Sequence, residues 1–145
     1  MKILITGYNG FVGSNLCNNL SDVELSGIDI TESSLVSHHY SWDNFYKTPP
    51  VDVVIHLAGK AHDTGNTSLA QEYFDINVGL TRQIFDFFLE SEARKFIFCS
   101  SVKAVADTVS GDGLDEKDTP DPKTPYGQSK LQAERYIVER LQQMI

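Results

Sequence analysis

Residues 2–13, Lys-Ile-Leu-Ile-Thr-Gly-Tyr-Asn-Gly-Phe-Val-Gly, decide the fold of this chain. The apolar, β-branched run from Lys2 to Thr6 predicts a strand, and glycines follow it at positions 7, 10 and 13. Apolar residues then recur every four positions, at Val12, Leu16 and Leu20, which predicts a helix. A strand, a turn with glycines at intervals of three and a helix are together typical of a loop that binds a dinucleotide.

The three glycines have separate roles in such a loop. Gly7 permits the tight turn, Gly10 lets the backbone approach a pyrophosphate, and Gly13 lets the helix pack closely on the strand. Unpaired amides and a partial positive charge at the helix N-terminus attract the phosphates. A purely structural glycine turn is the alternative, but the order of strand, turn and helix favours the binding role.

Asp29 indicates which dinucleotide this loop binds. It lies at the end of a second predicted strand, Val23–Ile28, about 20 residues beyond Gly7, where a carboxylate accepts hydrogen bonds from both hydroxyls of an adenosine ribose. The same carboxylate would repel the 2′-phosphate of NADP, and no Arg or Lys lies between Gly7 and Lys47 to offset this repulsion. The sequence therefore favours NAD over NADP.

The rest of the chain continues the alternation of strands and helices. Val51–Leu57 predicts a strand, Leu69–Phe87 carries a helical stripe of apolar residues, and Lys95–Cys99 predicts a continuous buried strand. Between the second and third predicted strands, Thr31–Thr48 has little periodicity. The pattern predicts an α/β fold of the Rossmann type, a doubly wound parallel sheet with helices on both faces.

We expect residues 1–145 to form one NAD-binding domain, because this length suffices for a single hydrophobic core. The helical pattern of Leu131, Ile137 and Leu141 still continues where the sequence stops. This pattern is more typical of a truncation than of a natural domain end.

Composition and charge argue against several other classes of protein. A formal net charge of −8 without a basic patch disfavours nucleic-acid binding. The apolar run at residues 3–5 is far too short for a signal peptide or a membrane span, so we expect a cytoplasmic protein that does not bind membranes. Cys17 and Cys99 lack the spacing of a metal site or a disulfide framework, and we expect reduced core thiols and no metal.

Tyr126 and Lys130 lie four residues apart in the last predicted helix, so that both project from one face. Thr124 can cap this helix and Pro125 suits its first position, after a loop over residues 110–124 rich in Gly, Pro and acids. A phenol, whose ordinary pKa is about 10, is a poor base at neutral pH, but a nearby ammonium favours the phenolate. Tyr126 is therefore a candidate to exchange a proton with a substrate hydroxyl.

A Tyr-x-x-x-Lys pair by itself is common and usually marks an exposed helix face. It gains weight from the strand Phe96–Cys99, which ends in Ser100-Ser101 and brings a hydroxyl to the carboxyl edge of the sheet. Sheets of this kind bind ligands at that edge. Ser101 is accordingly a candidate to orient the reacting hydroxyl or carbonyl.

Several motifs make the chain resemble the extended short-chain dehydrogenase/reductase family, especially its nucleotide-sugar epimerases of the UDP-glucose 4-epimerase type. The resemblance spans nearly the whole chain and implies that the chain is the N-terminal portion of a longer enzyme, truncated before its substrate-binding part. It rests on Thr-Gly-Tyr-Asn-Gly-Phe-Val-Gly at 6–13, Asp29, His-Leu-Ala-Gly at 56–59, Asn77, Phe-Cys-Ser-Ser at 98–101 and Pro-Tyr-Gly-Gln-Ser-Lys at 125–130.

This resemblance implies NAD as the cofactor and, with the glycine loop, a set of residues that contact it. The predicted cofactor contacts are Gly7, Asn9, Gly10, Phe11, Val12, Gly13, Asp29, Ile30, Leu57, Ala58, Gly59, Asn77, Ser100, Tyr126 and Lys130. Ser101, Tyr126 and Lys130 match the catalytic triad of the family, and Ser41 or Trp42 would contact the adenine. Two alternatives stay open, namely Asn77 as an internal helix cap and His56 as a satisfied core residue.

Two departures from the family pattern narrow the function. The chain lacks the Asp-Glu pair that the 4,6-dehydratases of the family carry after their active-site hydroxyl residue, which disfavours dehydration. Val105-Ala106-Asp107 replaces a common Val-Tyr-Gly, so that the substrate edge differs from that of the best-known epimerases.

The favoured function is an NAD-dependent nucleotide-sugar epimerase, with a UDP-sugar as substrate and Tyr126 as acid and base. A reductase or dehydrogenase of the same fold is the second hypothesis, and a dinucleotide-binding module without turnover is the third. The resemblance also implies a homodimer through the helices at 69–88 and 126–145, to which Phe85 and Phe88 would contribute.

Overall fold

The computed structural model of the chain describes residues 1–61, 69–109 and 111–144. Ser110 and Ile145, at the ends of the predicted loop and of the predicted dimer helix, lie outside the described residues. The chain forms two compact units. The first consists of Met1–Ala58 and Ile84–Cys99, and the second of Gly59–Gln83 and Ser100–Ile145.

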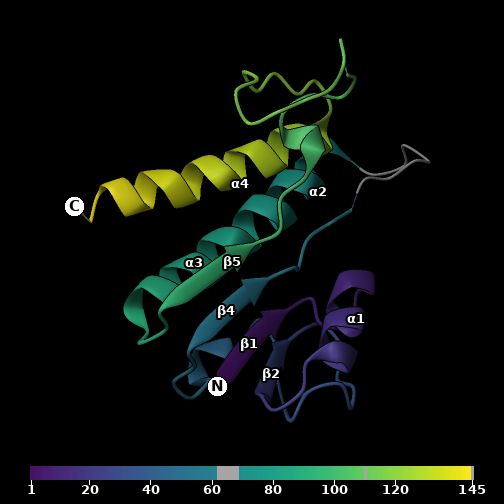
Figure 1. Ribbon diagram of the computed structural model, residues 1–145. Coiled ribbons are helices and arrows are strands. Elements are labelled where there is room, and N and C mark those ends of the chain that lie inside the picture. Colours follow the sequence, from purple (N-terminus) through teal and green to yellow (C-terminus); the bar gives the residue numbers. More distant parts are fainter. Residues whose placement is uncertain (62–68, 110, 145) are drawn as a thin grey trace. The chain divides into compact units, whose positions relative to one another are not determined.

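The described part of the first unit is built on a five-stranded parallel sheet in the order β3-β2-β1-β4-β5 (Figure 1). Its strands are β1 (Lys2–Thr6), β2 (Glu24–Ile28), β3 (His38–Tyr40), β4 (Val53–His56) and β5 (Lys95–Phe98). Its helices are α1 (Phe11–Asn19), the 3-10 turn η1 (Phe45–Lys47) and the part of α3 (Gly79–Glu90) from Ile84 onward. The predicted parallel sheet is confirmed, with β3 as an addition from the segment that has little periodicity.

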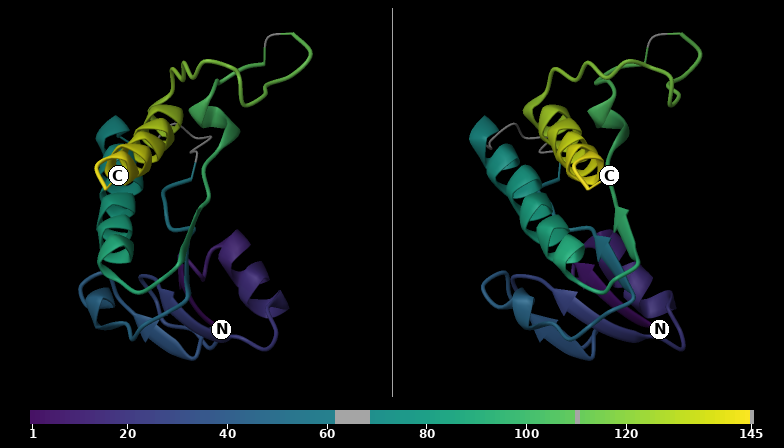
Figure 2. Two further views of the ribbon diagram at one scale, coloured as in Figure 1. Left: turned by 60° about the vertical axis from the view of Figure 1, so that its left-hand side comes forward. Right: turned by 90° about the vertical axis from the view of Figure 1, so that its left-hand side faces the viewer.

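Helices cover both faces of this sheet, as predicted. Successive residues of β1 point to opposite faces. Ile3 and Ile5 pack in one cluster with Cys17 of α1, whereas Leu4 packs in another with Ile84 of α3. Figure 2 shows α1 and this part of α3 on opposite sides of the strands. Burial raises the pKa of the Cys17 thiol, in keeping with its predicted role as a core thiol.

Two predicted burial states are wrong. β5 is half buried rather than continuously buried: Ile97 is 44% exposed and Cys99 is exposed, because β5 ends the described sheet and pairs with β4 alone. Phe85 is predicted to contribute to a dimer interface and so to be accessible at the surface, yet it is 1% exposed. Its ring packs edge-on against Phe96 at 4.9 Å, so it belongs to the core of the first unit.

The second unit is helical. It contains α2 (Ala70–Tyr73), a π-helical turn η2 (Phe74–Val78), the first residues of α3, a 3-10 turn η3 (Val102–Ala104) and α4 (Pro125–Gln142). The predicted helix from Leu69 is thus present with a π turn inserted in it. Among the described residues, no helix has the length and apolar character needed to cross a membrane.

Tyr8 of the glycine loop is a core residue of the first unit. It is fully buried in the cluster below α1, and its ring lies directly against Gly27 of β2. A Cβ at position 27 would overlap this ring. The phenol oxygen of Tyr8 lies 2.9 Å from Nδ1 of His39 in β3 and accepts the amide of Ser33 at 3.0 Å. Tyr8 thereby ties the glycine loop to β2 and β3.

We predict that Gly27→Ala lowers the free energy of unfolding by about 1 to 3 kcal/mol, because the buried Tyr8 ring must move. Gly79→Ala is the control, since no atom lies within 4 Å of a Cβ there and the residue is helical. It should stabilise by about 0.5 to 1 kcal/mol. Urea denaturation checks both values, and equal midpoints for Gly27→Ala and wild type would contradict the packing argument.

Candidate functional site

The glycine loop is held against the segment that follows β4. Gly7 adopts a φ of +69°, and a Cβ there would lie 2.7 Å from the backbone N and Cα of Ala58. The Gly7 amide donates to the carbonyl of Ile28 at 2.8 Å. At Gly13 a Cβ would overlap the carbonyl of Gly7, so the helix packs on the loop with no room for a side chain. The roles predicted for Gly7 and Gly13 fit this geometry.

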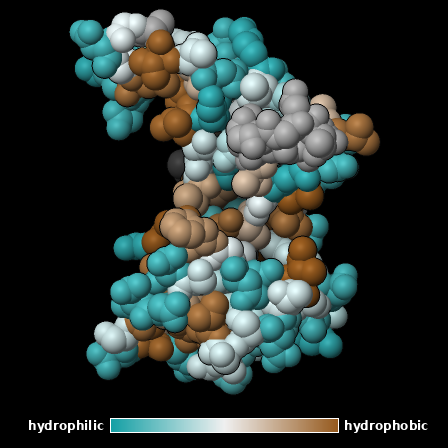
Figure 3. All heavy atoms as spheres, turned by 90° about the vertical axis from the view of Figure 1, so that its right-hand side faces the viewer, coloured by the Kyte–Doolittle hydropathy of each residue, from teal (hydrophilic) through white to brown (hydrophobic). Residues whose placement is uncertain are grey.

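The N-terminus of α1 leaves its first amides available to a ligand. Gly10 is the N-cap residue, and no side chain in the described part of the chain caps this end. The side chain of Phe11 is 87% exposed, and Val12 and Ile30 are exposed large apolar residues as well. Figure 3, which views the molecule from the side of α1, shows apolar groups among hydrophilic ones on this face. These features suit a group that carries both phosphates and an apolar ring.

Asp29 accepts two backbone amides of its own unit. One carboxylate oxygen accepts the Asn9 amide at 2.9 Å and the other accepts the Ile30 amide at 2.7 Å. The side chain of Asn9 donates to the carbonyl of Thr31 at 2.6 Å and accepts from Ser33 Oγ at 2.6 Å. Because an ionised carboxylate has about four acceptor positions, Asp29 keeps capacity for ribose hydroxyls.

Thr6 and His56 organise the end of β4. Oγ1 of Thr6 accepts the amides of Leu57 at 3.2 Å and of Ala58 at 3.1 Å, and it lies 2.6 Å from Nδ1 of His56. His56 is buried, and its ring stacks on that of Phe98. The alternative of a satisfied core histidine therefore holds. His56 supports Thr6, and Thr6 in turn holds the amides of Leu57 and Ala58.

Tyr126 and Lys130 lie one turn apart near the start of α4. Thr124 is the N-cap residue, with its side chain accepting the Gly127 amide, and Pro125 is the first helical residue, as predicted. The Tyr126 ring packs edge-on against Tyr73, with 6.1 Å between the centroids. Lys130 is only 8% exposed. Lys130 is thus a buried residue one helical turn from the phenol of Tyr126.

Ser100 and Ser101 follow β5. Oγ of Ser101 accepts the amide of Lys103 at 3.2 Å, which caps η3. Oγ of Ser100 is buried and has no hydrogen-bond partner within the described ranges. Buried hydroxyls are normally satisfied, so this atom fits the prediction that Ser100 contacts a bound group.

Asn77 lies in the π turn η2 and is buried. Its Oδ1 accepts the amide of Lys60 at 2.7 Å, and its Nδ2 donates to the Lys60 carbonyl at 3.2 Å and to Ser129 Oγ at 2.9 Å. Ser129 Oγ in turn donates to the carbonyl of Tyr126 at 2.8 Å. Asn77 thus supports the turn of α4 that carries Tyr126.

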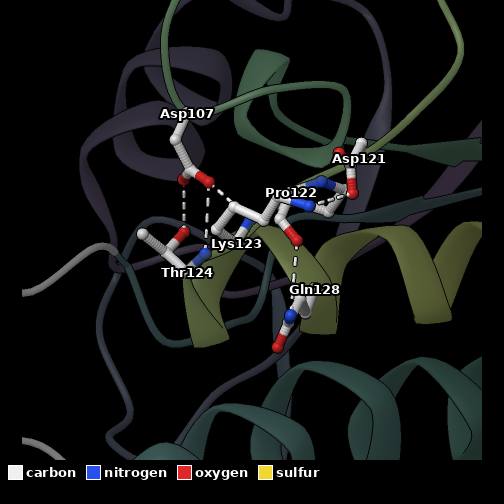
Figure 4. A network of polar contacts seen from close by, with 6 residues as sticks. All are labelled: Asp107, Asp121, Pro122, Lys123, Thr124 and Gln128. Atoms are coloured by element: carbon white, nitrogen blue, oxygen red, sulfur yellow. Dashed lines mark hydrogen bonds and ion pairs between the residues drawn. The ribbon is translucent and has the colours of Figure 1, made fainter.

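Asp107, which the sequence analysis did not single out as a site residue, is the centre of a polar network beside α4 (Figure 4). The hydroxyl of Thr124 lowers the pKa of its carboxyl below the ordinary value. The amides of Lys123 and Thr124 and the charge of Lys103 act in the same direction, against desolvation. Its donors lie 16 and 17 residues further along the chain, which no local pattern reveals.

The predicted site residues fall into two groups, one in each unit. The first unit holds the residues predicted to contact the adenosine and pyrophosphate, with Trp42 of the predicted adenine contact packed beside Phe45 and His56. The second unit holds Gly59, Asn77, Ser100 and the three predicted catalytic residues.

Comparisons with known proteins agree with these features. The chain is 26% identical to UDP-glucose 4-epimerase of Yersinia pestis, with 94% of the chain and 47% of that protein covered. Its fold matches MoeE5 in complex with UDP-glucose and NAD at a TM-score of 0.82 and 26% identity, over 96% of the chain and 48% of that one. UDP-glucuronic acid 4-epimerase from Bacillus cereus in complex with NAD matches at 0.74 and 30% identity, over 93% of the chain and 50% of that one.

The chain therefore spans about half the length of the relatives that it matches. The family described as NAD dependent epimerase/dehydratase matches residues 3–144. With its Rossmann-type sheet, its glycine loop and this match over almost its whole length, the chain belongs to the NAD dependent epimerase/dehydratase family.

Proposed function

We propose that the complete protein is an NAD-dependent nucleotide-sugar 4-epimerase that acts on a UDP-sugar. The observation that carries this proposal is the pair of Tyr126 and buried Lys130 on α4, in a family whose cofactor is NAD. UDP-glucose 4-epimerase of Yersinia pestis and the structure of MoeE5 with UDP-glucose and NAD support the choice of substrate class.

In the proposed reaction, Tyr126 removes the proton from a ring hydroxyl of the sugar as the hydrogen on the same carbon leaves as hydride. NAD, held by the residues predicted to contact it, would supply a reversible hydride acceptor at that carbon. Tyr126 then returns the proton to the oxygen of the keto sugar, so that atoms and electrons balance when the hydride re-enters on the opposite face. In this proposal Ser101 orients the reacting oxygen, and Lys130 lies one helical turn from the phenol of Tyr126.

The residues of the first unit supply the proposed binding of the ADP part of NAD. The amides at the N-terminus of α1 meet the pyrophosphate, and Asp29 accepts the ribose hydroxyls. The exposed side chains of Phe11, Val12 and Ile30 supply apolar contact. The orphaned hydroxyl of Ser100 is a further contact in the second unit.

We predict that Tyr126→Phe in the complete protein lowers turnover by about 100- to 10,000-fold and leaves NAD affinity nearly unchanged, since only the proton-transferring oxygen is lost. Lys130→Met should lower both. The assay follows interconversion of UDP-glucose and UDP-galactose, with GDP- and dTDP-sugars for comparison. Tyr126→Phe with more than about a tenth of wild-type turnover would exclude the acid–base role. Stoichiometric consumption of free NADH would instead identify a reductase.

We predict that Asp29→Ala weakens NAD binding by about 1.5 to 3 kcal/mol, because the ribose loses a charged acceptor. Asp29→Asn keeps one acceptor oxygen and should lie between this variant and the wild type. Calorimetric titration with NAD and NADP measures these affinities. Tighter binding of NADP than of NAD by the wild type would rule out the role of Asp29.

We also propose that the complete protein is a homodimer in which α4 takes part. Val138, Leu141 and Met144 are exposed apolar residues of this helix and the turn after it, and they replace Phe85 as the candidate contacts. Sedimentation at micromolar concentration should give a dimer for the wild type and a monomer for a Val138→Lys, Leu141→Lys variant. A wild-type monomer would refute the proposal.

A further inference from the structure

Asp107 holds three donors on one carboxylate at the point where α4 begins (Figure 4). One oxygen accepts the hydroxyl of Thr124 at 2.6 Å. The other accepts the amides of Lys123 at 2.5 Å and of Thr124 at 3.1 Å. All three donors belong to the two residues that immediately precede the helix carrying Tyr126 and Lys130.

Thr124 connects Asp107 to α4 through its hydroxyl. Its hydroxyl gives its only hydrogen to Asp107, so its oxygen is left to accept the amide of Gly127 at 3.3 Å. A cap of this kind satisfies one of the free amides at a helix N-terminus. Because the carboxylate fixes the orientation of the hydroxyl, the backbone around Tyr126 is held on both sides, at Thr124 and at Gly127.

Asp107 also connects α4 to the segment of Ser101. Its backbone carbonyl accepts from Nζ of Lys103 at 2.7 Å, and the amide of Lys103 donates to Ser101 Oγ at 3.2 Å. The carbonyl of Lys103 lies so close to Gly127 that no Cβ fits between them. One residue thus links the two segments of the second unit that carry the proposed acid–base group and the proposed orienting hydroxyl.

We infer that Asp107 is a positioning residue that sets Tyr126 relative to Ser101 through Thr124 and Lys103. The inference rests on the proposed function, because it needs Tyr126 to transfer a proton. A displacement of about 1 Å can cost on the order of 100-fold in rate. Loss of this anchor therefore acts on kcat, whereas binding of the ADP part of NAD depends on residues of the first unit.

The test measures kcat and NAD affinity of variants in the complete protein with NAD and its active nucleotide-sugar substrate. Asp107→Asn keeps the volume of the side chain but turns one acceptor into a donor that faces other donors. We expect kcat to fall by about 10- to 100-fold with NAD affinity unchanged. Asp121→Asn is the matched control, since this exposed carboxylate pairs with the exposed ammonium of Lys123, and it should keep wild-type kcat.

Two further measurements distinguish positioning from a general loss of stability. When Tyr126→Phe is already present, Asp107→Asn should not lower the residual rate further. The phenol oxygen that Asp107 positions is then already absent. Thr124→Ser keeps the hydroxyl and should retain far more kcat than Thr124→Val. This second comparison carries the test on its own if Asp107→Asn does not fold.

The inference is overturned if Asp107→Asn keeps wild-type kcat, or if Asp107→Asn lowers the residual rate of Tyr126→Phe further. It is also overturned if Thr124→Val has the same kcat as Thr124→Ser. Each of these results leaves the carboxylate with a structural role only. Failure of the proposed function has a separate signature, namely more than about a tenth of wild-type turnover in Tyr126→Phe, and that result removes the basis of this inference as well.

Discussion

The contact between the glycine loop and the segment after β4 is the constraint on which the first unit depends. A single oxygen, Oγ1 of Thr6, accepts two consecutive amides from residues about 50 positions away and also shares a hydrogen bond with His56. Gly7 then turns in the space that remains beside Ala58. Buried backbone amides must find acceptors, so this hydroxyl locks the ends of β1 and β4 together. The same hydrogen bonds hold the glycine loop of the proposed ADP site in place.

In the second unit, side chains rather than neighbouring strands bond the backbone groups that need partners. Asn77, in the π turn, satisfies both backbone groups of Lys60 and also bonds Ser129. Asp107 satisfies the amides that precede α4. Both residues act on the first turns of one helix. The start of α4 is therefore fixed by polar partners from two distant parts of the sequence.

Much of the fold and part of the site follow from sequence pattern, because they depend on local rules. The spacing of Gly7, Gly10 and Gly13 after an apolar strand predicts the loop, and Thr124-Pro125 predicts the start of α4. These features need only the chemistry of a few neighbouring residues. The same holds for the position of Asp29 at the end of β2.

The remaining features depend on partners that are distant in sequence. β3 has three residues, none of them fully buried, and so lacks an apolar period. The exposure of Cys99 depends on the place of β5 in the sheet, and the burial of Phe85 depends on its contact with Phe96. Asp107 resembles any loop acid until its donors are known. Long-range contacts of this kind leave no periodic signal in the sequence.

The contact of Tyr8 with Gly27 has a consequence for how members of this family diverge. The ring of Tyr8 occupies the space beside Gly27 that a side chain at position 27 would otherwise fill. Total core volume is conserved more strictly than the identity of any one residue. A relative that places a side chain at the position of Gly27 should therefore carry a smaller residue at that of Tyr8. Such a relative also lacks the phenol that joins the glycine loop to β3, and it must hold that loop by other means.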